Sequence, residues 1–202
     1  MEKKLTTPLA AEDIADLRVG DIVYLDGMLA TCRDISHRRR VLKHEKPDFE
    51  LAGMAIFHAG PIVQQCGDGG WRMVSIGPTT RMRMEKYQAE FIALTGVKLI
   101  IGKGGMGEKT AAACREHKTV HAVFPGGCAV VAAEAVEEIT SVEWLDQGMP
   151  EAFWVCRVKG FGPLIISIDT EGNNLFENNK QLFHTRQAQV MPAIMEKVHF
   201  MK

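Results

Sequence analysis

Short apolar runs separated by turn residues dominate the first part of the chain. Residues 21–31 read DIVYLDGMLAT, and Asp26 and Gly27, between the two apolar stretches, readily adopt the positive φ angles of a tight hairpin turn. Residues 55–78 show the same pattern of strand, turn and strand, with the chain reversal at residues 66–70. The pattern therefore predicts N-terminal β-hairpins and a largely antiparallel sheet in this part of the chain.

Beyond the second predicted hairpin, the apolar period changes to three or four residues. Met84, Tyr87, Phe91 and Leu94 fall on one helical face, and Gly96 ends that helix. Strands and helices then alternate, which indicates parallel strands joined by crossover helices. We expect a strand at 97–101, a helix at 108–118, a strand at 120–124, a helix at 128–139, strands at 140–145, 153–158 and 164–169, and a polar, partly helical segment after residue 173.

The length and composition fit one folded unit. The chain has 202 residues, 46% of them hydrophobic, which is enough for one substantial core. The sequence contains no internal repeat and no low-complexity linker, so nothing in it marks a domain boundary. We therefore expect a single α/β domain over residues 1–202, with a mixed sheet.

The charges of the chain are nearly balanced. Lys and Arg number 24 against 25 Asp and Glu, for a formal net charge of -1, so the chain lacks the global positive field that collects nucleic acids or acidic membranes. No apolar run approaches the roughly 20 residues of a membrane span, and the N-terminal residues lack the apolar core of a secretory signal. These features predict a cytoplasmic protein with no nucleic-acid and no membrane partner.

The cysteines do not form a recognisable ligand or disulfide pattern. They are odd in number, widely spaced and without a CxxC pair, which argues against a disulfide framework and fits a reducing compartment. The same spacing gives little support to a metal ion or iron–sulfur cluster held by this chain alone. The five are Cys32, Cys66, Cys114, Cys128 and Cys156.

Gly102, Gly104 and Gly107 spell GxGxxG in VKLIIGKGGMGEKT, between a predicted strand and a predicted helix. Such a loop presents backbone N–H groups to an anion. A dinucleotide site also needs an acidic residue about 20 positions later, where HAVFPGGCAVV has none and Glu134 follows only in the next helix. Lys103, between the first two glycines, suits a compact anion such as a carboxylate. A plain turn with a solvated lysine, an anion site and a dinucleotide site all remain open at this point.

Arg33, Asp34 and His37 form a dense charged cluster in CRDISHRRR, at the end of a predicted strand. Asp34 is placed to orient His37, whose unperturbed pKa of about 6.5 suits proton transfer. An N-capping aspartate followed by a solvated basic helix explains the same residues equally well.

Thr79, Thr80 and Arg83 lie in GPTTRMRM, where a predicted strand is followed by a helix. Hydroxyl groups there can cap unpaired backbone amides, and an arginine can hold a carboxylate through two parallel hydrogen bonds. An ordinary helix cap is the simpler interpretation. The three cation-bearing clusters, around Arg33, Arg83 and Lys103, would nevertheless match a small dicarboxylate if they converged on one pocket.

Seven motifs taken in order carry a resemblance to a known family: TCRDISHRR, FHAGPIV, SIGPTTRMRM, IIGKGGMG, FPGGCAV, GMPEAFWV and FGPLIISIDTEGN. They resemble the β subunits of L(+)-tartrate dehydratases and the C-terminal domain of iron–sulfur (class I) fumarate hydratases. The likeness runs from about Leu5 to Asn179. CRDISHRR and GMPEAFWVCRV are more similar to the tartrate enzymes, whereas TTxxR and GKGG are common to both.

The resemblance implies a subunit of a hydro-lyase whose [4Fe–4S] cluster is held by three cysteines of an α partner and not by this chain. It implies a swivelling three-layer β/β/α domain that closes on a small dicarboxylate, and an α2β2 assembly. Dehydration of L-tartrate to oxaloacetate is the implied reaction. The alternatives are the β subunit of a fumarate hydratase and, more distantly, a nicotinamide-nucleotide-binding oxidoreductase module that uses GxGxxG.

The family's functional residues are carried over by motif. His37 and Thr79 are the implied candidates for proton transfer, and the sequence does not choose between them. Arg81 stands where relatives are expected to have a small residue. The implied substrate-binding residues are Arg33, Thr79, Thr80, Arg83, Lys103 and Gly104.

Overall fold

The computed structural model describes residues 1–67, 69–80 and 82–198. The strands are β1 Glu2–Thr6, β2 Ile22–Thr31, β3 Ala55–Phe57, β4 Ala59–Gln65, β5 Trp71–Pro78, β6 Leu99–Gly102, β7 Val120–Val123, β8 Val136–Glu143 and β9 Phe153–Ile168. The helices are α1 Ala11–Ile14, α2 Asp34–Leu42, α3 Glu85–Thr95, α4 Glu108–His117, α5 Ala129–Glu134 and α6 Leu175–Lys197, with a 3-10 turn at Leu145–Gln147.

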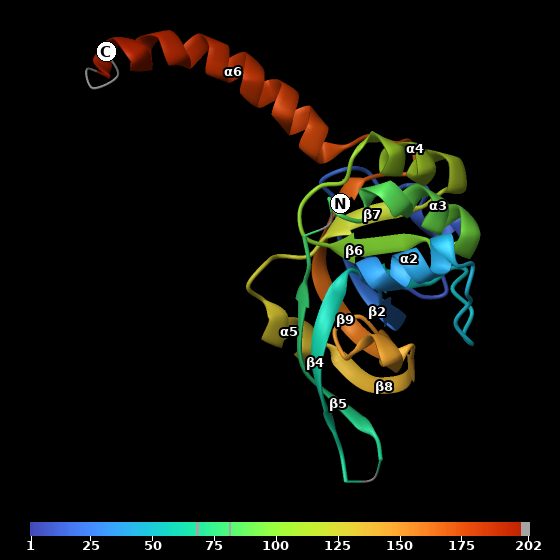
Figure 1. Ribbon diagram of the computed structural model, residues 1–202. Helices are drawn as coiled ribbons and strands as arrows, with labels where there is room; N and C mark the ends of the chain where they lie inside the picture. The colour runs from blue at the N-terminus through green and yellow to red at the C-terminus, as the bar shows by residue number, and fades with distance from the viewer. Residues whose placement is uncertain (68, 81, 199–202) are drawn as a thin grey trace.

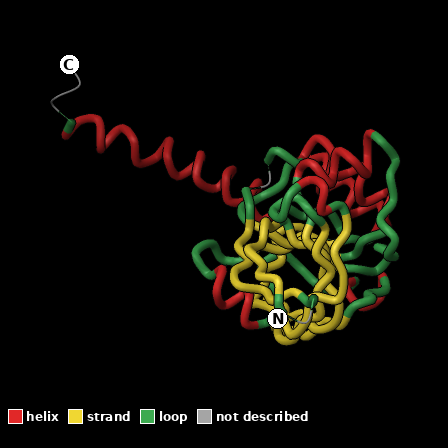
Figure 2. The backbone as a smooth tube through the Cα atoms, turned by 60° about the horizontal axis from the view of Figure 1, so that its bottom comes forward, coloured by secondary structure: helices red, strands yellow, loops and turns green. Residues whose placement is uncertain are grey.

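A mixed sheet closes on itself at the centre of the fold. Its strand order is β1-β2-β3-β6-β7-β9-β8, and β2 also pairs with β9, so that β2, β3, β6, β7 and β9 form a closed barrel (Figure 2). β9 makes the closure possible because its 16 residues pair antiparallel with β2, β7 and β8, with bulges that bend it. The mixed α/β class is as expected, whereas the closed barrel was not predicted.

Alternate residues of the barrel strands face two separate apolar clusters. Phe57 of β3 packs inside the barrel with Phe161, their ring centroids 5.2 Å apart. Ile56 and Ile100 face outward, against α3 through Phe91. Helices α2, α3 and α4 lie side by side over this outer face (Figure 1). The helices therefore cover the parallel part of the sheet and begin at one of its edges.

The parallel part confirms the predicted alternation of strands and helices. β2, β3, β6 and β7 are parallel neighbours. α3 ends at Gly96, whose φ of +67° is the left-handed conformation expected of a glycine after a helix. β4 and β5 form the predicted antiparallel hairpin as a separate two-stranded sheet.

Asp26 and Gly27 lie inside β2, so the first predicted hairpin is wrong. β2 is continuous, pairs in parallel with β1, and pairs antiparallel with β9 on both sides of Gly27. Gly27 has a φ of +95°, and the register with β9 shifts between Leu25 and Gly27. The positive φ is used for a β-bulge, where the Asp26 carboxylate accepts a hydrogen bond from the N–H of Gly160 at 2.7 Å.

Two C-terminal predictions also differ from the structure. The helix expected at 128–139 ends with α5, and the residues from Val136 onward form β8, because pairing with β9 outweighs their weak helical preference. The strands expected at 153–158 and 164–169 are one strand, β9.

Helix α6 extends away from the rest of the protein (Figures 1 and 2). None of its described residues is buried. No helix in the described part of the chain is long and apolar enough to cross a membrane.

Candidate functional site

The candidate residues lie at the carboxyl ends of the parallel strands. Arg33 follows β2 and is the residue from which α2 begins, and Lys103 directly follows β6. Hydrogen bonds hold the strand ends together: the N–H of Cys32 donates to the Phe57 carbonyl at 3.0 Å, and the N–H of His58 donates to the Ile101 carbonyl at 2.8 Å. Proteins of the α/β class commonly bind ligands at this edge of a sheet, because the carboxyl ends of the strands and the first turns of the helices meet there.

The segment that follows β5 is joined to the same edge. The backbone N–H of Thr79 donates to the carbonyl of His58 at 2.7 Å. Thr80 forms an isolated parallel bridge with Lys103. TTxxR and GKGG, which are far apart in sequence, are therefore direct neighbours. Arg81 lies outside the described residues.

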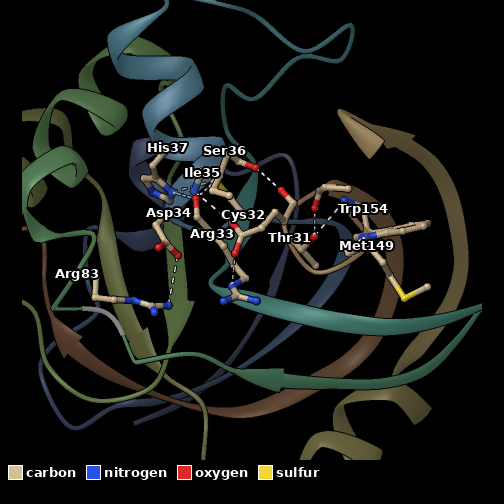
Figure 3. Close-up of polar contacts among 12 residues, drawn as sticks. Thr31, Cys32, Arg33, Asp34, Ile35, Ser36, His37, Arg83, Met149 and Trp154 are labelled. Atoms are coloured by element: carbon tan, nitrogen blue, oxygen red, sulfur yellow. Dashed lines mark hydrogen bonds and ion pairs between the residues drawn. The ribbon is translucent and has the colours of Figure 1, made fainter. Parts of the chain in front are cut away.

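Two guanidinium groups, those of Arg33 and Arg83, lie near Asp34 (Figure 3). Arg83 Nη2 is 3.3 Å from Asp34 Oδ1, and Arg33 Nε is 3.1 Å from Glu151 Oε1. Figure 3 shows the ends of both arginines on the same side of Asp34. The structure thus brings Arg33 and Arg83 together, and their partners leave other N–H groups of each fork available to a ligand.

The Arg33 side chain packs against Gly60 and Glu151, two contacts that were not expected from the sequence. A Cβ atom on Gly60 would come within 2.6 Å of Arg33 Nη1, so a side chain at this point of β4 would displace the guanidinium group. Glu151 also accepts a hydrogen bond from the N–H of Ile35 at 3.2 Å, and burial raises the pKa of the Glu151 carboxyl group. Glu151 belongs to the motif GMPEAFWV, for which no site residue was expected, and the fold brings it to Arg33.

Lys103 is exposed. We call the edge that carries Arg33, Thr79, Thr80, Arg83 and Lys103 the rim. The Lys103 side chain runs over Gly126, where an added Cβ would lie 3.3 Å from Lys103 Cε. Gly104 has a φ of +79°, which favours glycine at this position. Through Thr80 and Arg83, the segment after β5 connects Lys103 to the Asp34 cluster.

His37 is fully buried behind Arg33. Its Nδ1 atom lies 2.8 Å from the Arg33 carbonyl oxygen and 3.1 Å from Cys32 Sγ, and its ring packs 4.3 Å from the Phe91 ring between centroids. Burial lowers the pKa of His37 to about 4. Asp34 pairs with Arg83 and does not orient His37, so that expectation is wrong. His37 is held on the backbone carbonyl of Arg33 because it follows that residue by one helical turn.

The glycine loop already contains an anion from the protein itself. The Glu85 carboxylate accepts hydrogen bonds from the N–H of Gly107 at 2.8 Å, the N–H of Thr110 at 3.2 Å and the hydroxyl of Thr110 at 2.7 Å. These donors form the N-terminus of α4, where a dinucleotide fingerprint would place its pyrophosphate. Glu85 therefore occupies that position, which disfavours the dinucleotide interpretation of GxGxxG.

An open pocket of about 830 Å³ lies beside the rim. Asp34, Arg83, Glu85 and Gly107 are among the residues that line it, whereas Arg33 and Lys103 are not. The pocket therefore adjoins the Asp34–Arg83 side of the candidate site.

Three of the five cysteines, Cys32, Cys114 and Cys156, are buried. Burial raises the pKa of Cys156 to about 12, and it also raises the pKa of Cys114 and of Cys32, which disfavours the thiolate form that binds metals. Within residues 1–67, 69–80 and 82–198, no group of three His, Cys, Asp or Glu side chains is placed to hold a metal ion. All five cysteines are free.

The sequence profile described as Fumarase C-terminus matches residues 2–179. The chain belongs to the fumarase C-terminus family. A relative in Escherichia coli strain K12, named L(+)-tartrate dehydratase subunit beta, is 57% identical over 202 residues, with 100% of both chains covered.

Other members of the fumarase C-terminus family are more distant. A protein of Methanocaldococcus jannaschii, provisionally named L(+)-tartrate dehydratase subunit beta, is 43% identical over 180 residues, covering 87% of this chain and 92% of its own. A protein of Geobacillus stearothermophilus, provisionally named a class I fumarate hydratase, is 38% identical over 174 residues, covering 86% of this chain but 33% of its own. This relative therefore has a much longer chain, and the present sequence matches 33% of it.

Proposed function

We propose that this chain is the β subunit of an L(+)-tartrate dehydratase. The full-length identity of 57% to a protein of that name carries the proposal, because the relative named as a fumarate hydratase reaches 38% over part of the chain. The β subunit of a class I fumarate hydratase, acting on fumarate and malate, is the alternative.

In this proposal, the rim of the barrel holds the two carboxylates of the substrate. Arg33 and Arg83 provide planar forks that bind a carboxylate through two hydrogen bonds, and Lys103 provides a point charge for the second carboxylate. Thr80 and Gly104 complete the rim beside Lys103. Fixing both ends of the diacid orients the central carbons before any bond breaks.

Dehydration removes a proton from one central carbon and the hydroxyl group from the other, which gives an enol that tautomerises to oxaloacetate. We assign the proton transfer on this side to the Thr79 hydroxyl, because Thr79 is half-buried on the rim. His37, fully buried, acts through Arg33 by holding its backbone carbonyl. In this proposal His37 is a positioning residue.

We place the [4Fe–4S] cluster of the enzyme on an α partner. The name "subunit beta" of the relatives implies such a partner, and the buried thiols of this chain are poor cluster ligands. We further propose that residues 1–202 act as a single swivelling β/β/α domain, that the assembly is α2β2, and that the free cysteines reflect a cytoplasmic setting.

An anaerobic assay tests this function. The α and β subunits are purified separately and combined, and oxaloacetate is measured with L-tartrate, in parallel with assays on malate and fumarate. We expect turnover of L-tartrate only in the combined sample, with kcat/KM higher than for malate. Higher kcat/KM for malate or fumarate would support the alternative, and turnover by the β chain alone would contradict the proposal.

A further inference from the structure

Glu85 joins two segments of the candidate site that are distant in sequence. It is the first residue of α3 and lies two positions after Arg83. Its carboxylate receives three hydrogen bonds, from the N–H groups of Gly107 and Thr110 and from the Thr110 hydroxyl, at 2.7 to 3.2 Å. One side chain thus fixes the end of the glycine loop from the neighbouring helix.

The contact replaces a missing helix cap. Gly107 is the N-cap residue of α4 and has no side chain to satisfy the first amides of that helix. Glu85 satisfies two of these amides from outside, and its negative charge also complements the positive end of the helix dipole. A Cβ atom on Gly107 would lie 2.8 Å from Glu85 Oε1. The third glycine of GxGxxG is therefore explained by the close approach of a carboxylate from the protein, not of a phosphate.

Both ends of the loop between β6 and α4 are held by the same segment. Lys103 begins the loop and is bridged to Thr80, and Gly107 ends it and is held by Glu85. Arg83 lies between these two attachment points and contacts Asp34. Lys103 and Arg83 carry the charges proposed to bind the diacid. They lie on two segments that are joined to each other at both ends.

We propose that Glu85 is a positioning residue that sets the separation between Lys103 and Arg83 for the two carboxylates of the substrate. The proposal rests on the proposed function, because it takes a dicarboxylate as the ligand. Glu85 faces the loop backbone and acts through the loop, so its loss should weaken substrate binding more than it slows the chemical step.

Steady-state kinetics of the αβ complex test this role with Glu85→Gln. The amide keeps the size of the side chain but loses the charge and one acceptor, so we expect KM for L-tartrate to rise about tenfold with kcat lowered less than about threefold. Glu90→Gln is the matched control, because Glu90 lies exposed on the same helix. An unchanged KM in Glu85→Gln, or equal changes in the two variants, would overturn the proposal.

A second measurement on the full-length β chain does not depend on activity. Amide hydrogen exchange at Gly107 and Thr110 should be protected in the native chain and at least about tenfold faster in Glu85→Gln. Gly107→Ala, whose methyl group displaces the Glu85 carboxylate, should give the same loss of protection at Thr110 and the same rise in KM. If exchange changes as expected but L-tartrate is not a substrate, the proposed function fails and the contact between Glu85 and the loop stands. If exchange at these amides is the same in all three chains, that contact itself is refuted.

Discussion

Neighbouring charged residues in this chain have different physical tasks. In CRDISHRRR, Arg33 reaches Glu151 on the rim, whereas His37, four residues later, is fully buried against Phe91. Sequence proximity suggested that Asp34 would orient His37, but the Asp34 side chain turns toward Arg83. One helical turn separates a half-buried charge from a fully buried ring.

The burial of His37 predicts a dependence of stability on pH. Its pKa is lowered from 6.5 to about 4 in the folded chain, so between these values the unfolded state binds more protons. The free energy of unfolding should therefore fall as the pH is lowered from about 6.5 toward 4, by up to about 3 kcal/mol from this residue. Urea unfolding of the native chain and of His37→Gln at several pH values measures this contribution. Parallel pH profiles for the two chains would show that His37 does not titrate as expected.

The residues that the sequence identified are those that follow strands directly. Arg33, Thr79 and Lys103 were located by their motifs at strand ends. The parallel strands bring Arg33 and Lys103 to one edge, and a backbone hydrogen bond to His58 joins Thr79 to it. Glu151 and Glu85 were missed because their roles depend on contacts with residues 118 and 22 positions away in the chain. No periodicity or local spacing reports such contacts.

At the scale of the elements, local pattern was reliable where one helix or short strand forms by itself. α3, β6, α4 and β7 follow their expected positions. β9 was divided into two strands because Gly160, Gly162 and Pro163 interrupt its apolar pattern, and the first half of β8, residues 136–139, was assigned to a helix. Both errors concern residues whose conformation is decided by pairing across the barrel.

α6 should contribute little to the stability of the rest of the chain. Its described residues are all exposed or half-buried, although it begins with a well-made cap in which Asn174 accepts from the N–H of Phe176 at 3.1 Å and donates to the Met106 carbonyl at 2.9 Å. Ending the chain after Asn179 keeps that cap and Phe176, so the thermal midpoint should change by no more than about 2 °C.

Asn174→Ala in the full-length chain is the contrasting variant. It removes the cap and leaves the buried Met106 carbonyl without this donor, so it should lower the midpoint by about 2–4 °C. Differential scanning calorimetry of the three chains makes the comparison. A truncation more harmful than the point substitution would show that α6 packs on the rest of the chain.

At the scale of the whole molecule, the closed barrel positions the residues of the rim. Five strands close through β9, their parallel ends carry Arg33 and Lys103, and the hairpin β4-β5 leads into the segment that carries Arg83. An open pocket of about 830 Å³ lies beside this rim, lined in part by Asp34, Arg83 and Glu85. In the proposed enzyme, a surface of the α subunit lies opposite this rim and completes the substrate-binding site.

The most direct test of the central claim, that this chain provides the carboxylate-binding side of the site, is the KM for L-tartrate of an αβ complex containing Lys103→Met. Lys103 is exposed, so the substitution leaves the fold intact, and loss of one charge-assisted contact should raise KM about 10- to 100-fold with little change in kcat. Lys159→Met, which removes another exposed lysine on β9, should leave KM unchanged. If the Lys103→Met complex saturates with L-tartrate at the same concentration as the native complex, the claim is contradicted.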